Sequence, residues 1–399
     1  MNYQRPENEL VVLCSRANLC DDAQTRIKTL LDEDTFDWDY CFDFARHHHV
    51  TPLLCYHMER LNLPNVSQAR RNQFKVWYHR HSFRNLFLTS ELLKTQRIFK
   101  GREIPVLTVK GPVLSKMVYG DVTLREYADV DLVVRVDDIS RLKEALLNTG
   151  YKLDEETRLE KDSIYMQSHY NYPFTHQSGV FNLEVHWRLW ESEFESWLHT
   201  DTIWQHTTHE MMSDNESVIT LNGHYLLLYL LVHGTKHQWS RLSWICDVNE
   251  LLSSDVDIDW EALRDYMRTA RMRRVVLLGL LLARDLLGAA LPDAIVDMIN
   301  ADRELHPLAN ETYAALFAQK PQDNRLSYFL RMREHPIDKA RHVLRMWGRR
   351  MVPSMQDTEW IKLPRSLYFL YYLARPVRIL ASAIWRRSAN ETNSVKDKT

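Results

Sequence analysis

The sequence predicts an α+β protein in which a small mixed β-sheet core is embedded between an amino-terminal and a carboxyl-terminal helical region. Apolar residues recur at helical spacing from about residue 7 to 100, and no glycine interrupts them. Between residues 101 and 190 the pattern changes to short β-rich runs separated by turn signals, and beyond about residue 221 the helical spacing returns. We therefore expect three regions: residues 1–100 helical, 101–220 the α/β core, and 221–399 helical with a basic amphipathic end.

Composition and charge exclude several classes of protein. The chain has 399 residues and is 45% hydrophobic, so we expect it to fold. Its formal net charge is -2, so the chain as a whole should not attract polyanions. Its five cysteines include no C-x-x-C pair, which argues against a disulfide framework and against a thiolate zinc site. The first residues lack the pattern of a secretory signal. We expect a cytoplasmic protein.

Periodicity and turn signals predict the elements up to the start of the core. We expect four or five helices before residue 100. The run "EIPVLTV", residues 103–109, is typical of a short strand, and Gly111 and Pro112 then end it and begin a helix over "VLSKMVY". A strand-to-helix unit is therefore expected at this end of the core.

The rest of the core is predicted as a second strand, a helix and a hairpin. The stretch "REYADVDLVVRV", residues 125–136, contains an apolar run typical of a buried strand. A helix over "ISRLKEALLNTG" follows, and Asp137 and Asp138 can cap it. The segments "SIYMQSHYNYPFTH" and "GVFNLEVHWRLW" meet at a polar turn over residues 177–179 and are expected to form a β-hairpin.

Two aspartates in the second strand occupy positions where folding does not require a charge. Strand side chains alternate between faces, so Asp129, Asp131 and Val133 share one face and the apolar residues between them share the other. Two like charges about 7 Å apart on a partly buried face repel each other and lose hydration unless a cation compensates. On an exposed edge the same pair would be solvated charge. The apolar opposite face favours a buried strand. Because the two aspartates of a buried strand need a compensating charge, the pattern favours a divalent metal ion beside them.

The hairpin strand is expected to supply a third carboxylate. Residues 181–187 alternate apolar and polar side chains, which puts Glu184 and His186 together on the polar face. Carboxylates of Asp129, Asp131 and Glu184 converging from neighbouring strands can hold two Mg²⁺ or Mn²⁺ ions about 3.5 to 4 Å apart. His186 can orient a metal ligand or touch substrate. The chemistry implied is phosphoryl or nucleotidyl transfer.

The motifs around these carboxylates resemble a known family. The stretch "VKGPVLSKMVYGDVTLREYADVDLVV", followed about fifty residues later by "LEVHWRL", is similar to the polymerase-β-like nucleotidyltransferase superfamily, and most closely to its branch of poorly characterised bacterial nucleotidyltransferases. The resemblance extends more loosely over most of the chain. It implies that Asp129 and Asp131 are the metal-binding pair and Glu184 the third carboxylate. The superfamily's usual Gly-Ser pair, which grips nucleotide phosphates at a helix start, appears here as Lys-Gly-Pro at residues 110–112.

A phosphate site is still expected at residues 110–112. Gly111 lets the backbone approach a ligand closely, the helix that follows presents its positive end, and Lys110 adds a point charge. Arg125 can bind a phosphate through two parallel hydrogen bonds, or it can form a structural salt bridge. We predict that Lys110, Gly111 and Arg125 bind the nucleotide.

The carboxyl-terminal region carries a local excess of basic residues. Between residues 331 and 387, Lys and Arg outnumber Asp and Glu by roughly three to one. The segment "SLYFLYYLARPVRILASAIW" is apolar and aromatic, but Arg375, Pro376 and Arg378 interrupt it where a spanning helix would bear the greatest cost. We therefore expect no transmembrane segment. The segment can cover the core, lie on a membrane surface or hold an anionic acceptor such as RNA.

The leading functional prediction is a metal-dependent nucleotidyltransferase. It would transfer a nucleoside monophosphate from a nucleoside triphosphate such as ATP to an acceptor hydroxyl, releasing pyrophosphate, and Asp131 or Glu184 can accept the hydroxyl proton. The acceptor is left open between a sugar, a protein, an RNA end and a small molecule. One alternative is a catalytically idle relative that binds a partner or a nucleotide, for example in a toxin-antitoxin system. Another is an accessory protein of glycan synthesis, peripheral at the inner face of the membrane.

Overall fold

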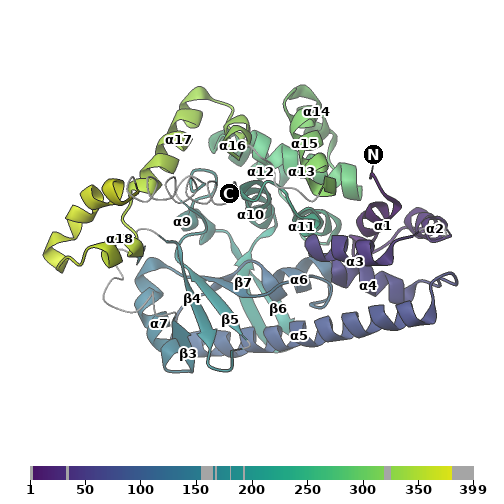
Figure 1. Cartoon of the computed structure of the whole chain (residues 1–399), viewed down its shortest axis with the longest axis horizontal. Helices are drawn as coiled ribbons and strands as arrows, with labels where there is room; N and C mark the ends of the chain where they lie inside the picture. Colours follow the sequence, from purple (N-terminus) through teal and green to yellow (C-terminus); the bar gives the residue numbers. More distant parts are fainter. Residues whose placement is uncertain are drawn as a thin grey trace, which may run out of the picture.

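The structure has a seven-stranded mixed sheet with helices on both of its faces, which confirms the predicted α+β class. It is a computed structural model. In Figure 1 the sheet lies in the lower half of the molecule, the carboxyl-terminal helices lie above it, and one long helix runs below it. The residues that the structure describes are 3–32, 36–153, 165–166, 169–179, 181–191, 194–318 and 325–379.

In the described part of the chain five helices precede the sheet, in agreement with the predicted four or five. They are α1 (Pro6–Cys14), α2 (Asp21–Leu30), α3 (Trp38–His47), α4 (Thr51–Arg60) and α5 (Gln68–Lys100). The long helix α5 begins at an N-cap serine, because the side chain of Ser67 accepts a hydrogen bond from the backbone N–H of Arg70. Farther along, α5 packs Leu88, Leu92 and Phe99 into the core under the sheet.

The sheet has the strand order β3-β4-β5-β2-β1-β7-β6. Its strands are β1 (Leu107–Thr108), β2 (Val130–Val133), β3 (Tyr151–Leu153), β4 (Asn171–His176), β5 (Asn182–His186), β6 (Thr207–Ser213) and β7 (Glu216–Leu221). The pairs β2–β5 and β1–β7 are parallel, and the other pairs are antiparallel. The predicted strands correspond to β1, β2, β4 and β5, whereas β3, β6 and β7 have no counterpart among the predicted segments.

Short helices connect the strands. Among the described residues they are α6 (Gly111–Tyr119), α7 (Ile139–Leu147), α9 (Thr200–Ile203) and η1 (Val136–Asp138), a 3₁₀ helix of one turn. The predicted strand-to-helix unit is present, because α6 follows β1 directly and carries its proline in the first turn. The expected cap of α7 is different: the Asp138 carboxylate accepts a hydrogen bond from Arg141 Nη1 at 2.9 Å and makes no capping bond to the backbone.

The two faces of β2 belong to different parts of the core. Val130, Leu132 and Val134 pack into the cluster that contains α5 and α7. Val133 packs into the cluster formed by the amino-terminal helices and the carboxyl-terminal helices. The alternation predicted from the sequence is therefore correct, and the face shared with Val133 looks toward the carboxyl-terminal helices.

The carboxyl-terminal helices cover the polar face of the sheet and continue beyond it. They are α10 (Gly223–Lys236), α11 (Leu242–Ser253), α12 (Trp260–Thr269), α13 (Arg273–Leu287), α14 (Asp293–Ala301), α15 (Leu305–Ala318), α16 (Arg325–Met332), α17 (Pro336–Met351), α18 (Met355–Trp360) and the 3₁₀ helix η3 (Arg365–Leu370). Buried residues of α10, α11 and α13 join those of α1, α3 and α4 in one cluster. Among the described helices, none is both long enough and apolar enough to span a membrane.

Helix α11 carries a buried carboxyl group whose titration should affect stability. Glu250 is 5% exposed and accepts a hydrogen bond from Asn249 Nδ2 at 3.0 Å. Burial raises the pKa of Glu250 to about 7, because the charged form loses its hydration. The folded protein therefore keeps a proton that the unfolded chain has already released. The stability from this proton is complete below about pH 4 and is lost as the pH rises through about 7.

Glu250→Gln should remove this pH dependence. Between about pH 5 and pH 8 we expect the free energy of unfolding of the wild type to fall by about 1 to 3 kcal/mol relative to Glu250→Gln. Urea unfolding at each pH measures the difference. Glu261→Gln, at an exposed position of α12, is the matched control and should follow the wild type. A gap between the wild type and Glu250→Gln that did not change with pH would contradict the assignment.

Candidate active site

The candidate site is a cavity of about 300 Å³ between the polar face of the sheet and helix α10. Its lining comes from the end of β1, from β2 and β5, from the turn after β5 and from α10. Five residues singled out from the sequence line it: Lys110, Asp129, Asp131, Glu184 and His186.

The pairing of β2 with β5 brings three of these side chains together. The two strands are parallel, and their register places Asp131 opposite Glu184 and Val133 opposite His186. One ligand atom from each of Asp131, Glu184 and His186 lies within 4.8 Å of the others. Asn171 on β4 donates a hydrogen bond to Glu184 Oε2 at 2.7 Å, so the neighbouring strand holds this carboxylate in place.

His186 sits inside this group and not behind it. Its Nε2 is 3.3 Å from Asp131 Oδ1 and 3.3 Å from Glu184 Oε2. Burial alone would lower the pKa of His186, but its hydrogen bonds to Asp131 and Glu184 and the charges of both carboxylates outweigh burial and raise it. The imidazole therefore acts as a partial counter-charge to the two carboxylates.

Lys110 supplies the main positive charge next to Asp131. Its Nζ is 2.7 Å from Asp131 Oδ2 and 3.4 Å from His233 Nε2. Burial would raise the pKa of Asp131, yet the charge of Lys110 and the hydrogen bond from His186 hold it well below its ordinary value. Burial would lower the pKa of Lys110, and the Asp131 carboxylate raises it above its usual range. Both groups are therefore charged, and a lysine already compensates Asp131.

Gly111 lies at the junction between β1 and α6, against the backbone of Asp129. Its φ is +63°, a left-handed conformation that glycine adopts without steric cost. A Cβ atom at this position would lie 3.7 Å from the carbonyl oxygen of Asp129. The amino terminus of α6, with its free N–H groups and its positive dipole end, is thus beside the aspartates.

Asp129 lies in the bend just before β2 and lines the same cavity, next to the compact group of Asp131, Glu184 and His186. Burial, followed by repulsion from Asp131 and Glu184, raises the pKa of Asp129, although the charge of Lys110 opposes this. A divalent cation between Asp129 and Asp131 would relieve the repulsion.

Arg125, a predicted nucleotide-binding residue, lies outside the cavity lining. Its Nε and Nη2 donate to the two carboxylate oxygens of Asp247 on α11 at 2.7 and 2.8 Å, and the Tyr119 hydroxyl donates to Asp247 Oδ1 at 2.9 Å. The side chains of Arg125 and Asp247 are 10% and 2% exposed. Of the two possibilities predicted for Arg125, the structural salt bridge is therefore present. It joins the segment before β2 to α11.

Helix α10 contributes cavity residues that were not among the predicted site residues. His233 and Lys236, three residues apart on one face of α10, line the cavity. Lys236 Nζ is 2.9 Å from Glu191 Oε2 and 3.4 Å from the hydroxyl of Tyr170. The spacing of His233 and Lys236 was a usable signal, but nothing in the local sequence shows which strand the helix faces.

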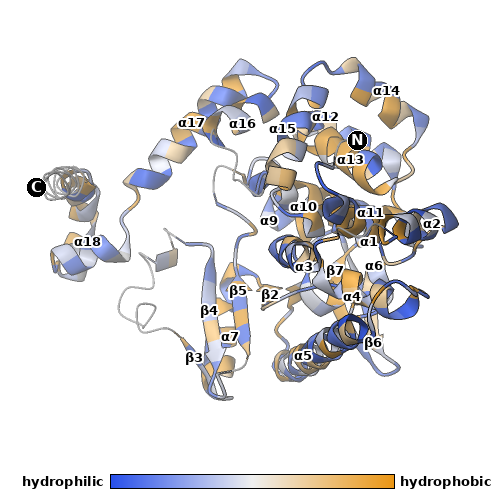
Figure 2. Cartoon of the chain, turned by 45° about the vertical axis from the view of Figure 1, so that its right-hand side comes forward, coloured by the Kyte–Doolittle hydropathy of each residue, from blue (hydrophilic) through white to orange (hydrophobic). Residues whose placement is uncertain are grey.

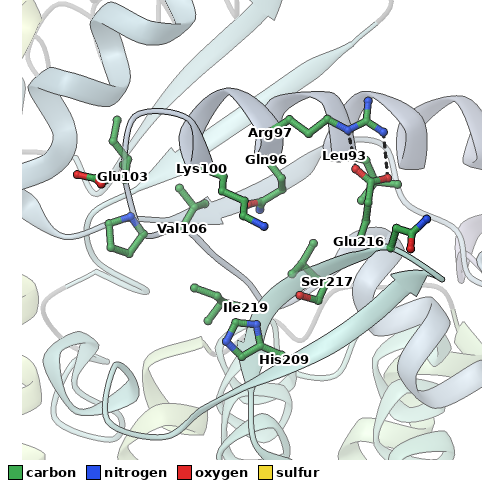
Figure 3. A pocket seen from close by; sticks show the side chains of 14 residues that line it. Leu93, Gln96, Arg97, Lys100, Glu103, Val106, His209, Glu216, Ser217 and Ile219 are labelled. Carbon is green, nitrogen blue, oxygen red and sulfur yellow. Dashed lines mark hydrogen bonds and ion pairs between the residues drawn. The ribbon is translucent and has the colours of Figure 1, made fainter.

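A second cavity, of about 490 Å³, lies on the α5 side of the sheet between α5 and the β6–β7 hairpin. In Figure 3 the Arg97 guanidinium of α5 reaches the Glu216 carboxylate, with Nε 2.5 Å from Oε1 and Nη2 3.0 Å from Oε2. Asp131 and Glu184 face the other side of the sheet. We therefore place the chemistry in the smaller cavity.

Comparison with known protein families identifies a family that matches the chain. A family described as "Uncharacterised nucleotidyltransferase" matches residues 34–288. The chain belongs to this nucleotidyltransferase family. The family resemblance predicted from the two sequence motifs is thereby confirmed. The matched range includes the seven described strands and the cavity wall from Lys110 to Lys236. A search of curated proteins finds no match to the chain.

The donor set of this nucleotidyltransferase family member fits a divalent cation. Carboxylate oxygens are the ligands that Mg²⁺ and Mn²⁺ prefer, and an imidazole nitrogen is acceptable to Mn²⁺ and to later transition metals. Asp131, Glu184 and His186 already converge, and Asp129 is adjacent. Members of nucleotidyltransferase families generally depend on such ions for catalysis.

Proposed function

We propose that the protein transfers a nucleoside monophosphate from a nucleoside triphosphate to an acceptor hydroxyl, with release of pyrophosphate, and that Asp129, Asp131 and Glu184 hold Mg²⁺ or Mn²⁺. The observation that carries the proposal is the parallel register of β2 and β5, which sets Asp131 opposite Glu184 in a cavity next to a helix amino terminus. When bound there, the divalent cation activates the attacking oxygen and neutralises charge on the transferring phosphate.

The remaining cavity residues are arranged to receive the phosphates. Lys110, the residue that precedes the first turn of α6, and Lys236 of α10 both line the cavity. Burial lowers the pKa of His233 well below its ordinary value, so its neutral ring can accept a hydrogen bond from Lys110. In this proposal Lys110 contacts a phosphate oxygen whenever Asp131 serves as a metal ligand.

The proton of the acceptor hydroxyl passes to a carboxylate of the cavity. Asp131 and Glu184 are the two candidates named from the sequence, and Glu184 is the more exposed of them, with 35% of its side chain accessible against 15% for Asp131. An acceptor arriving from solvent meets Glu184 first. We therefore assign proton acceptance to Glu184, with Asn171 fixing its orientation.

A second candidate function is supported by the ion pair between Lys110 and Asp131. A lysine ammonium 2.7 Å from the carboxylate supplies the positive charge that a metal ion would supply. Such an arrangement suits a relative that binds a nucleotide or a partner without performing chemistry. The two candidates differ in whether a metal cation can displace the ammonium of Lys110 from the Asp131 carboxylate.

Lys110→Met should distinguish the two candidates. If Lys110 competes with a cation for Asp131, its removal should lower the dissociation constant for Mn²⁺ at least about tenfold, which corresponds to about 1.4 kcal/mol. Isothermal titration calorimetry of the purified protein with Mn²⁺ measures this. Lys100→Met, at an exposed position of α5, is the matched control and should bind Mn²⁺ like the wild type. Absence of Mn²⁺ binding to both the wild type and Lys110→Met would support the idle relative.

Transfer itself is tested with nucleoside triphosphates labelled on the α-phosphate. The purified protein is incubated with each of them, with Mg²⁺ or Mn²⁺ and with cell extract, and whatever becomes labelled is identified. Label should appear in an acceptor when it is on the α-phosphate and not when it is on the γ-phosphate, because pyrophosphate leaves. Labelling of the protein itself would identify protein as the acceptor class. If every nucleotide fails with both metals, the transferase proposal is contradicted.

We further propose that residues 101–220 form the catalytic core and that the helical regions 1–100 and 221–399 complete it. Helix α10 supports the proposal that a helical region completes the catalytic core, because His233 and Lys236 of α10 line the cavity but lie outside residues 101–220. A cytoplasmic location, where nucleoside triphosphates are available, fits this activity.

A further inference from the structure

The carboxyl-terminal arm, residues 336–379, exposes an unusual share of apolar side chains. It comprises α17, α18, η3 and the helical turns over residues 371–379. Of the twenty large hydrophobic side chains exposed in the described part of the chain, twelve belong to the arm. In Figure 2 α17 leads away from the other helices, and α18 lies at its far end. The arm is therefore a projecting element whose apolar side chains do not contribute to the core.

Helix α17 turns its apolar stripe away from the protein. Ile337, Leu344, Trp347 and Met351 recur at a spacing of seven, three and four residues, which places them on one helix face, and all four are exposed. The buried residue of α17 is His342, on the opposite face, where its ring lies 5.6 Å from that of Phe329. A surface helix normally packs its apolar stripe on the core, so this orientation is inverted.

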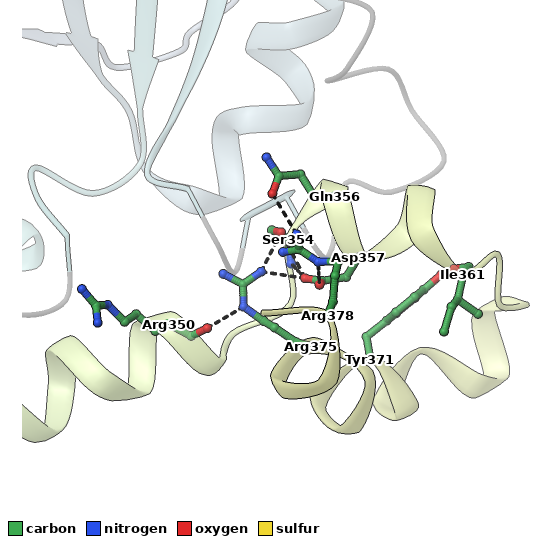
Figure 4. A network of polar contacts seen from close by, with 8 residues as sticks. All are labelled: Arg350, Ser354, Gln356, Asp357, Ile361, Tyr371, Arg375 and Arg378. Atoms are coloured by element: carbon green, nitrogen blue, oxygen red, sulfur yellow. Dashed lines mark hydrogen bonds and ion pairs between the residues drawn. The ribbon is translucent and has the colours of Figure 1, made fainter. Parts of the chain in front are cut away.

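The end of the arm has the same inverted arrangement. Arg375 and Arg378 both point inward, and Figure 4 shows them meeting the buried carboxylate of Asp357, with Arg375 Nη1 2.6 Å from Oδ2 and Arg378 Nε 2.5 Å from Oδ1. Phe369 and Leu373, four residues apart on the other side, are exposed. Burial would raise the pKa of Asp357, but its hydrogen bonds from Arg378, Ser354 and Arg375 lower it. The charges hold the arm together from inside, and the apolar side chains face out.

Basic side chains flank the exposed apolar ones. The arm contains nine Lys and Arg against three Asp and Glu, in a chain whose formal net charge is -2. Arg345, Arg350 and Lys362 are exposed, and the Arg350 guanidinium lies 5.6 Å from the ring of Trp347. Exposed tryptophan beside arginine is the composition that favours the boundary between lipid headgroups and hydrocarbon.

We propose that the arm docks on the surface of an anionic membrane, with the apolar stripes of α17 and of residues 369–377 inserted at headgroup level and the basic side chains on lipid phosphates. The charge of the arm argues against a second copy of the same arm as its partner, because two such surfaces repel each other. Contact with a nucleic-acid backbone would use the basic residues but would leave the apolar stripes in water. The proposal is independent of the chemistry in the cavity, because the arm uses different residues.

Vesicle flotation of the full-length protein tests the docking. One set of vesicles contains phosphatidylcholine alone, and in the other about one third of the lipid is phosphatidylglycerol. We expect binding to the anionic vesicles, weakened by added salt, and little binding to phosphatidylcholine. Leu344→Glu combined with Leu373→Glu changes two side chains that are 69% and 70% exposed, so the fold should be kept, as melting curves will check. This variant should lose at least about tenfold in vesicle affinity.

Phe83→Glu is the matched control, because Phe83 is 75% exposed on α5, outside the arm. It should bind anionic vesicles like the wild type. The proposal is overturned if the wild type fails to bind, if the Leu344 and Leu373 variant binds equally well, or if Phe83→Glu loses as much. It is also overturned if the protein does not bind vesicles but light scattering shows a dimer, and the Leu344 and Leu373 variant is a monomer. Binding of RNA without binding of vesicles would overturn it as well.

Discussion

Asp131→Asn is expected to lower the rate of nucleotidyl transfer by about 10² to 10³ or more. The substitution keeps the shape of the side chain but removes the charge that faces Glu184 across the parallel strands. A preorganised charge in a low-dielectric site is worth far more than the same charge in water, so its loss is not recovered by solvent. Glu184→Gln should have an effect of the same order. The measurement is the initial rate with a nucleoside triphosphate labelled on the α-phosphate.

Stability in the absence of metal should separate Asp131 from Asp129. Asp131→Asn leaves the partly buried ammonium of Lys110 without its partner at 2.7 Å, so the free energy of unfolding should fall by about 1 to 3 kcal/mol. Asp129→Asn removes a charge that burial and the neighbouring carboxylates disfavour, so the protein in EDTA should be equally stable or slightly more stable. Both variants should nevertheless be impaired in transfer.

Asp137→Asn is the matched control, because Asp137 is exposed and lies six residues after Asp131. It should match the wild type in rate and in melting temperature. If Asp129→Asn melted several degrees below the wild type in EDTA, and if Mg²⁺ with nucleotide failed to stabilise the wild type, the pair would be structural and the catalytic proposal would fail.

Asp247→Asn is expected to destabilise the protein by about 3 to 5 kcal/mol. Asp247 receives hydrogen bonds from two nitrogens of Arg125 and from the Tyr119 hydroxyl in a buried setting. Loss of the carboxylate charge leaves the guanidinium of Arg125 desolvated and uncompensated, which costs more than the pair itself contributes. Arg125→Met should be destabilising for the converse reason. Urea unfolding curves measure both variants.

The double variant Arg125→Met with Asp247→Leu provides the control for this ion pair. Because it removes both charges together, it should be more stable than either single variant. Substitution of Arg125 should also leave the KM for the nucleotide unchanged in any variant that stays folded, because Arg125 does not line the cavity. A normal unfolding curve for Arg125→Met together with a raised KM would instead restore Arg125 to the nucleotide site.

Much of the candidate site could be predicted from local sequence because the side chains of a strand alternate between its two faces. The alternation of strand side chains is enough to put Asp131 on one face and Val130 and Leu132 on the other. The same alternation along the hairpin strand puts Glu184 and His186 together. Glycine and proline at residues 111–112 mark the strand-to-helix junction. These inferences need no knowledge of which strands pair.

The partners of the charged residues could not be predicted in this way. Lys110 forms an ion pair with Asp131 because β1 pairs with β2. Arg125 forms an ion pair with Asp247, more than a hundred residues away, because α11 packs against α6. His233 and Lys236 enter the cavity only because α10 crosses the polar face of the sheet. An ion pair depends on distance and burial, and neither is contained in local periodicity.

The sequence by itself determined the α+β class, the order of the main core elements and the face of each strand that carries carboxylates. These properties follow from the covalent geometry of strands and helices, which repeats every two or 3.6 residues. Tertiary structure decided that β2 lies parallel to β5, which sets Asp131 opposite Glu184. It also decided that the apolar stripe of α17 faces solvent. A periodic pattern defines a face, but only the packing of distant elements decides what that face meets.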